Sequence, residues 1–172
     1  MRYYYMMDYL PVRYSGTDQQ VADRKAVWNF KDGCAPARIV TGLVERVRTI
    51  AGGRPSDYVV CFVPASTGWK TTRRYSHVAS EIQRLTGVQA TLSAVTRNGD
   101  GEPGHITGKA ADPAAEFSFC PQFFRGKNVI LIDDVVTRGR TLSGTGDRIL
   151  SGGATSVVGL VVARTINPDW AA

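Results

Sequence analysis

The chain has 172 residues, of which 43% are hydrophobic and 21% charged, a composition that is typical of one folded globular domain and argues against a long disordered segment. Lys and Arg number 21 against 15 Asp and Glu, and the resulting charge of +6 favours phosphate-rich partners, either nucleic acid or small phosphorylated metabolites. No apolar run approaches the roughly 18 residues that a membrane span requires, and Met1–Leu10 has no signal-peptide core, so we expect a cytoplasmic protein with no membrane partner.

Apolar runs typical of buried strands alternate along the chain with apolar residues at helical spacing. The expected elements, in chain order, are a helix over Val21–Phe30, a helix over Ile39–Ile50, a strand over Asp57–Val63, a helix over Tyr75–Leu85, a strand near Ala90–Val95, a strand over Val129–Ile132, a helix over Thr141–Leu150 and a strand over Ser156–Val162. This alternation predicts an α/β fold with a mostly parallel sheet flanked by helices. Because no linker divides the chain, we expect a single domain over residues 1–172.

Two segments depart from the alternation. Residues 1–35 begin with an aromatic-rich, extended stretch, and we expect them to form a small N-terminal hood or flap. Residues 96–114 lose their periodicity and collect Gly, Pro, Asp and Asn, which predicts a flexible loop of about twenty residues. Loops of this length are uncommon in compact domains, so the segment is either a cover over a site or an inert insertion.

The most informative segment is Val129–Thr141, VILIDDVVTRGRT, in which two acids follow an apolar strand and precede a turn that opens into a helix. Ligands gather at the carboxyl ends of parallel strands, where Asp133 and Asp134 would emerge. The turn from Thr137 to Thr141 would present backbone N–H groups at a helix N-terminus, and Gly139 would allow a ligand to approach closely. These features predict a cradle for a monophosphate.

Two carboxylates beside an anion site make sense if a sugar or a metal lies between them. Carboxylates accept hydrogen bonds from vicinal ribose hydroxyls and can stabilise positive charge at the anomeric carbon. We therefore interpret Asp133 and Asp134 together with the turn as a ribose 5-phosphate site. The alternative is that the two acids only cap a turn.

Other motifs fit the sequence poorly. The chain contains neither the G-x-x-x-x-G-K-[ST] phosphate loop nor the G-x-G-x-x-G dinucleotide fingerprint. Cys34, Cys61 and Cys120 are widely spaced without a C-x-x-C pair, and His77 and His105 lie far apart, so a structural zinc site and a disulfide scaffold are disfavoured. No block of Lys and Arg marks a nucleic-acid tail, which makes nucleic acid a less favoured partner without excluding it.

The segment VILIDDVVTRGRT resembles the 5-phosphoribosyl 1-pyrophosphate (PRPP) binding signature of type I phosphoribosyltransferases, with Arg138 where that family often has Thr or Ala. Within this group the chain is most similar to the competence protein F (ComF) family. Val63–Ala79 resembles that family's P-x-H-x-x-R…R-G-F-N-Q-A segment, although Arg74 replaces the usual Gly and His77 the usual Gln. Trp28–Gly33 (WNFKDG) resembles its F-K-x-x-G stretch, and the family's N-terminal four-Cys element is missing.

The resemblance implies the Rossmann-like type I phosphoribosyltransferase fold and transfer of a phosphoribosyl group from PRPP to a nucleobase-like acceptor, with release of pyrophosphate. Mg²⁺ is the implied cofactor, held mainly by PRPP with Asp133 or Asp134 as the candidate side-chain ligand. On this basis the acids bind the ribose hydroxyls as the catalytic pair. The residues expected to bind the 5-phosphate are Thr137, Arg138, Gly139, Arg140 and Thr141. Those expected to bind pyrophosphate are Ala65, Ser66, Thr67, Gly68, Arg73 and Arg74.

Several further residues keep two interpretations. The loop Pro64–Gly68 is either a pyrophosphate loop or an ordinary strand-to-helix turn. Lys70, like the neighbouring arginines, either meets pyrophosphate or lies on a solvated face, and Lys31 either reaches the site from the N-terminal segment or stays at the surface. His77 is expected at the surface, and His105 acts only if its loop closes. The tyrosines of the first nine residues either stack on the acceptor base or pack on a sheet face or in a homodimer contact.

The function that the resemblance implies is therefore an enzyme of nucleotide salvage or a related pathway. The alternative is a module that binds PRPP or a nucleotide without turnover and serves in regulation, competence or DNA uptake. Release of pyrophosphate with one acceptor would distinguish the enzyme from the module, and binding that weakens steeply with salt would indicate DNA.

Overall fold

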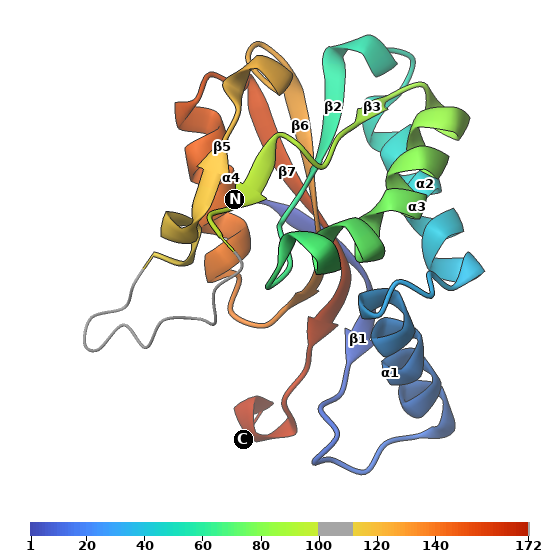
Figure 1. Ribbon diagram of the computed structural model, residues 1–172. Helices are drawn as coiled ribbons and strands as arrows, with labels where there is room; N and C mark the ends of the chain where they lie inside the picture. The colour runs from blue at the N-terminus through green and yellow to red at the C-terminus, as the bar shows by residue number, and fades with distance from the viewer. Residues whose placement is uncertain (100–111, 172) are drawn as a thin grey trace.

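The computed structural model describes residues 1–99 and 112–171 and is built around a parallel five-stranded sheet with the strand order β1-β7-β6-β2-β3 (Figure 1). Its strands are β1 (Tyr3–Tyr9), β2 (Tyr58–Phe62), β3 (Gln89–Ala90), β6 (Asn128–Val136) and β7 (Ser156–Thr165). The α-helices are α1 (Asp18–Lys31), α2 (Ala37–Ala51), α3 (Gly68–Thr86) and α4 (Arg140–Ser151). The predicted α/β fold with a mostly parallel sheet flanked by helices is confirmed.

A small antiparallel pair, β4 (Val95–Arg97) and β5 (Phe117–Phe119), lies outside the main sheet. Short 3-10 helices complete the described part: η1 (Pro55–Asp57), η2 (Pro113–Glu116), η3 (Pro121–Phe123) and η4 (Pro168–Ala171). None of the helices in residues 1–99 and 112–171 is both long and apolar enough to cross a membrane.

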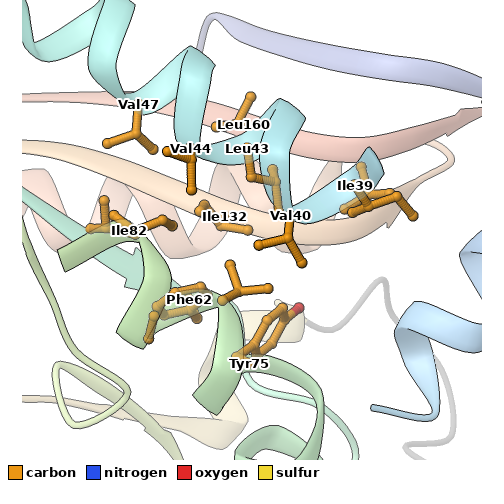
Figure 2. Packing of buried hydrophobic residues seen from close by; sticks show 14 of the residues in the cluster. Ile39, Val40, Leu43, Val44, Val47, Phe62, Tyr75, Ile82, Ile132 and Leu160 are labelled. Atoms are coloured by element: carbon orange, nitrogen blue, oxygen red, sulfur yellow. The ribbon is translucent and has the colours of Figure 1, made fainter. Parts of the chain in front are cut away.

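Hydrophobic cores cover both faces of the sheet because alternate side chains of a strand point to opposite faces. Ile130 and Ile132 of β6 face α2 and α3, whereas Val129 and Leu131 face α4 and the β4-β5 pair. Figure 2 shows the first of these cores, in which the apolar side of α2 packs against Phe62 of β2 and side chains of α3. The cores hold the carboxyl ends of the strands in fixed positions.

Helix boundaries follow from local signals in the sequence. The side chain of Thr17 caps α1 in a reciprocal arrangement with Gln20, and the side chain of Thr67 accepts a hydrogen bond from the backbone N–H of Lys70 at the start of α3. Gly87 ends α3 in the left-handed conformation with φ +75°. Thus α3 begins at Gly68, seven residues before the predicted start at Tyr75.

The predicted N-terminal flap needs correction. β1 pairs with β7 along its length, with Tyr3 opposite Gly159 and Tyr9 opposite Thr165, so the aromatic stretch is an edge strand of the main sheet. Helix α1 then carries the chain past the carboxyl ends of the strands (Figure 1). The N-terminal segment is therefore an integral part of the fold.

Two other expectations change. The strand predicted near Ala90–Val95 is divided between β3 in the main sheet and β4 in the antiparallel pair. The loop predicted over residues 96–114 lies mostly outside the described residues, as does His105, and its ends belong to β4 and η2. A turn stabilised by the Thr91 hydroxyl, which accepts a hydrogen bond from the Ser93 N–H, separates the two short strands.

Candidate functional site

A cavity of about 630 Å³ lies at the carboxyl ends of β2 and β6, beside the N-terminus of α4. Of the site residues predicted from the sequence, the structure brings ten together around it: Ala65, Ser66, Arg74, Asp133, Asp134, Thr137, Arg138, Gly139, Arg140 and Thr141. Lys31 reaches the same cavity from the end of α1, whereas Thr67, Gly68 and Arg73 do not line it. Its position agrees with the general location of ligand sites in parallel α/β sheets.

The two acids belong to β6, which continues through Val136 and so is longer than predicted. Because successive residues of a strand face opposite sides, Asp134 turns toward α1 and α3, while Asp133 continues the row of Val129 and Leu131. Asp133 is half-buried and Asp134 is 7% exposed. An Oδ1 atom of Asp133 accepts a hydrogen bond of 2.8 Å from the backbone N–H of Asp134, which links the orientations of the two residues.

Two cations hold the carboxylate of Asp134. Arg74 Nη1 donates to Asp134 Oδ2 at 2.5 Å, and Lys31 Nζ lies 3.7 Å from the same oxygen. Arg74 Nε also donates to the backbone carbonyl of Lys31 at 3.2 Å, so the arginine joins α3 to α1 as well as to β6. Breaking one side of such a buried pair is costly because the other charge is left without compensation.

Asp133 has a different environment from its neighbour. Burial raises the pKa of the Asp133 carboxyl well above its usual range, and the nearby charge of Asp134 raises it further. The charged form of Asp133 is therefore the destabilised one in this structure. A ligand that supplies hydroxyl donors or positive charge at this point would relieve that cost.

The turn after β6 has the geometry of an anion site. Gly139 has φ +73° and precedes α4, in a conformation that other residues adopt only at a cost. No side chain caps the first turn of α4, which leaves its N–H groups directed toward the cavity end of the helix. Within the described part of the chain, neither Arg138 nor Arg140 forms an ion pair, so both charges are available to a ligand.

Two residues of the loop after β2 use their polar groups in hydrogen bonds within the protein. The N–H of Ala65 donates to Thr71 Oγ1 at 2.9 Å, and its carbonyl accepts from Arg97 Nε at 2.8 Å. Thr67 serves as the cap of α3 and its carbonyl accepts from the Thr71 hydroxyl. Ala65 and Thr67 thus stabilise a strand-to-helix turn, while Ser66 remains exposed at the edge of the cavity.

The side chains of Arg73 and Arg74 point in different directions because the two residues are consecutive in α3. From the sequence we expected both arginines to precede this helix. Arg74 points into the cavity, but Arg73 Nε donates to the carbonyl of Asp32 at 2.6 Å and its guanidinium lies 5.2 Å from the ring centroid of Trp69. His77 on the same helix is exposed and does not line this cavity.

A glycine that we noted only as part of a motif explains how α1 and α3 approach each other. Gly33 has φ +84°, and a Cβ atom there would lie 2.5 Å from Arg73 Cγ and 2.6 Å from the backbone oxygen of Arg73. Only a residue without a side chain fits this contact. The glycine of WNFKDG therefore positions Lys31 beside Asp134.

The tyrosines of β1 are distributed over the sheet edge. Tyr4 and Tyr9 pack against the core under α2 and α3, Tyr3 packs against the other core, and Tyr5 is covered by the guanidinium of Arg164 at 4.5 Å. None of the four lines the cavity with the acid pair. Their environment agrees with packing on the sheet.

The possible donors for a metal are few. In the part of the chain that the structure describes, no group of three or more His, Cys, Asp and Glu side chains is close enough to hold a metal ion. The two carboxylates of β6 fit Mg²⁺ that keeps most of its ligands from phosphates and water, which is the usual manner in which this ion binds. Asp133 fits this role better than Asp134, whose Oδ2 already has two cationic partners.

Several solved structures are similar to most of this chain. An allosteric regulatory enzyme of purine biosynthesis matches with a TM-score of 0.50 and 20% identity, over 72% of this chain and 25% of its own. A hypoxanthine-guanine phosphoribosyltransferase from Bacillus anthracis matches with a TM-score of 0.48 and 17% identity, over 83% of this chain and 71% of its own. A hypoxanthine phosphoribosyltransferase from Staphylococcus aureus matches with a TM-score of 0.43 and 11% identity, over 83% of this chain and 76% of its own. No family model and no curated protein sequence matches the chain.

The present chain thus spans a quarter of the length of the regulatory enzyme. At these identities the similarity shows the fold alone. That fold is the parallel sheet flanked by helices that the alternation of strands and helices in the sequence predicts.

Proposed function

We propose that the chain is a PRPP-dependent phosphoribosyltransferase and that the cavity between β2, β6 and α4 binds PRPP. The observation that carries the proposal is the arrangement of Asp133 and Asp134 next to an uncapped helix N-terminus that begins at Gly139. This arrangement offers acceptors for ribose hydroxyls on one side. On the other side it offers N–H donors with Arg138 and Arg140, which form no ion pair with residues 1–99 and 112–171. The fold, the sequence signature and the predicted cytoplasmic location are consistent with such an enzyme.

In the proposed reaction, a nucleophilic atom of the acceptor forms a bond to the anomeric carbon of PRPP. The bond from that carbon to the pyrophosphate oxygen breaks, and pyrophosphate leaves with the electron pair. Where the nucleophilic atom carries a proton, that proton passes to solvent, and positive charge develops on the ribose ring during the exchange. Asp133 and Asp134 would stabilise that charge and orient the ribose, which makes positioning and electrostatics the main contributions of the protein.

The phosphate groups would bind at separate places. The turn over 137–141 would hold the 5-phosphate through backbone N–H groups, the Thr141 hydroxyl and Arg140. Hydrogen bonds to a charged group contribute roughly 1.5–3 kcal/mol each, so a few of them suffice for a dianion. Ser66 and Arg74 would meet the pyrophosphate, for which Arg74 must exchange its bond to Asp134 for one to the ligand.

Mg²⁺ fits this site through Asp133 and the phosphate oxygens of PRPP. When bound, it would neutralise charge on the departing pyrophosphate. The side chains of the protein would then have no covalent step to perform.

The experiment that tests the proposal is calorimetric titration with PRPP, with and without Mg²⁺, followed by an assay of pyrophosphate release with a panel of acceptors. We expect saturable binding that is tighter with Mg²⁺, and release with one class of acceptor. Arg140→Gln should weaken PRPP binding about tenfold or more, the loss of one charged hydrogen bond. Arg46→Gln, an exposed arginine of α2 outside this cavity, is the matched control and should bind normally. Absence of saturable binding by the wild-type chain would refute the proposal.

A second candidate function is a module that binds PRPP or a nucleotide without turnover, as the resemblance to the ComF family allows. The observation that favours it is the ion pair between Arg74 and Asp134, which occupies one of the two ribose-binding acids. Saturable PRPP binding without pyrophosphate release from any acceptor would identify the module. Release would identify the enzyme.

A further inference from the structure

A second cavity, of about 660 Å³, is lined by residues from the end of α1 and the start of α3. Its lining residues are Trp28, Lys31, Asp32, Cys34, Ser66, Trp69, Lys70, Arg73 and Arg74. Three of them, Lys31, Ser66 and Arg74, also line the cavity assigned to PRPP. The two cavities are therefore neighbours that share a wall.

Two exposed tryptophans define the character of the second cavity. Trp28 is 41% exposed and Trp69 is 65% exposed, which is unusual for such large apolar side chains unless they meet a ligand or partner. The indole N–H of Trp28 donates to the hydroxyl of Tyr9 at 3.0 Å, which fixes the orientation of that ring. Aromatic faces held in this way are suited to stacking on a planar ligand.

The charge of the cavity is strongly positive. Four cationic side chains, Lys31, Lys70, Arg73 and Arg74, line it together with a single carboxylate, Asp32. Lys31 and Arg74 pair with Asp134 of the first cavity, so Lys70 and Arg73 supply the charge that belongs to this cavity alone. Lys70 is exposed and makes no ion pair within residues 1–99 and 112–171, so its charge is not neutralised by the protein. A neutral heterocycle would leave this charge unused, whereas an anionic ring would both stack and form charged hydrogen bonds.

The position beside the PRPP site adds a second reason for the positive charge. PRPP is itself strongly anionic, and a second anion next to it would be repelled unless the protein compensates. Six cations, Lys31, Lys70, Arg73, Arg74, Arg138 and Arg140, line the two cavities against three carboxylates, Asp32, Asp133 and Asp134. This excess of positive charge reduces the repulsion between two anionic ligands that bind side by side.

We propose that the second cavity binds the phosphoribosyl acceptor and that this acceptor is a planar aromatic ring carrying a carboxylate or another anionic group. The inference rests on the proposed function, because it names the class of substrate that reacts with PRPP at the shared wall. Trp69 and Trp28 supply the stacking surface, and Lys70 with Arg73 supplies the charge that selects the anion.

The test compares matched pairs of ligands that differ in charge, nicotinate with nicotinamide and orotate with uracil, together with benzoate and anthranilate. Calorimetry with the full chain in the presence of PRPP measures the affinity of each. We expect at least one acid to bind, and to bind at least about tenfold more tightly than its neutral counterpart, as a charged hydrogen bond predicts. Failure of all acids to bind, or equal affinity for an acid and its neutral partner, would overturn the inference.

Variants at the surface of the cavity supply the second part of the test. Trp69→Leu should weaken binding of the acid about tenfold through lost stacking, and Lys70→Gln about fivefold or more through lost charge. Arg84→Gln removes an exposed charge from the far end of the same helix and should bind the acid normally. If Trp69→Leu binds the acid as tightly as the wild type, the cavity is not the acceptor site.

PRPP affinity separates this inference from the proposed function. Trp69→Leu and Lys70→Gln should bind PRPP as the wild type does, because neither residue lines the first cavity. A chain that binds PRPP but none of the acids refutes only the acceptor class. A chain that does not bind PRPP refutes the proposed function itself.

Discussion

Replacing Asp133 by Asn should stabilise the protein at neutral pH while weakening its affinity for PRPP. The pKa of the Asp133 carboxyl is raised by burial and by the charge of Asp134, so the folded chain binds this proton more tightly than the unfolded chain does. The stability that the protonated group contributes is fully present below the ordinary pKa of Asp, about 4, and is lost as the pH rises through the raised value. Asn cannot ionise, and its side-chain oxygen can still accept the hydrogen bond from the Asp134 N–H.

The magnitude follows from the linkage between pKa and stability. Each unit by which the folded-state pKa exceeds the unfolded one costs the wild type about 1.4 kcal/mol at neutral pH. For a chain of this size, that corresponds to a gain of roughly 3–5 °C in Tm for Asp133→Asn. The affinity for PRPP should fall about tenfold or more, because a hydrogen bond to a charged group is lost.

Thermal unfolding monitored by circular dichroism between pH 4 and pH 8, with calorimetric titration of PRPP at pH 8, measures both effects. The advantage of Asp133→Asn over the wild type should grow as the pH rises and vanish near pH 4. Asp147→Asn, at an exposed carboxylate of α4, is the control and should show no such trend. A variant whose Tm at pH 8 is equal to or below that of the wild type would refute the reasoning about Asp133.

Three other outcomes are expected. Gly139→Ala should lower the free energy of unfolding by about 1–2 kcal/mol because of φ +73°, and it should weaken PRPP binding; urea unfolding and calorimetry measure the two effects, and unchanged stability would contradict the assigned backbone conformation. Arg74→Gln should lower the free energy of unfolding by about 3–5 kcal/mol in the same urea assay, because Asp134 loses its closest cation. A decrease below about 1 kcal/mol would mean that the ion pair is not formed in solution. Cys34 is exposed whereas burial raises the pKa of Cys61 to about 12, so a thiol reagent at pH 8 should modify Cys34 rapidly and Cys61 only after unfolding; equal rates would be inconsistent with the core.

Much of the fold is readable from the chain because its strongest signals are local. Apolar residues at helical spacing between Ile39 and Ile50 predict α2, and the apolar runs at Val129 and Ser156 predict the two central strands β6 and β7. The segment VILIDDVVTRGRT was informative for the same reason: strand, acids, glycine and helix start follow one another in thirteen residues. These features lie close together in space mainly because they are close together in the sequence.

Features that depend on distant parts of the chain could not be predicted. β1 is a strand of the main sheet because it pairs with β7, and nothing in the first nine residues identifies that partner. The pairing of Arg74 with Asp134 and the opposite orientation of Arg73 depend on where α3 begins. Thr67 determines this by capping the helix, so that α3 starts at Gly68, seven residues before the predicted start at Tyr75. The cavity between α1 and α3 could not be predicted either, because it depends on the close approach of the two helices at Gly33.

The pairing of β1 with β7 has a consequence for synthesis. Among the described strands of the main sheet, β1 is synthesised first and β7 last, and β7 is the only strand that pairs with β1. Until β7 emerges, the backbone N–H and C=O groups of β1 and its row of tyrosines have no partner, and such an edge can pair with other nascent chains. β1 can therefore dock into the sheet only after β7 has been made, so the sheet is completed late in the folding of this domain.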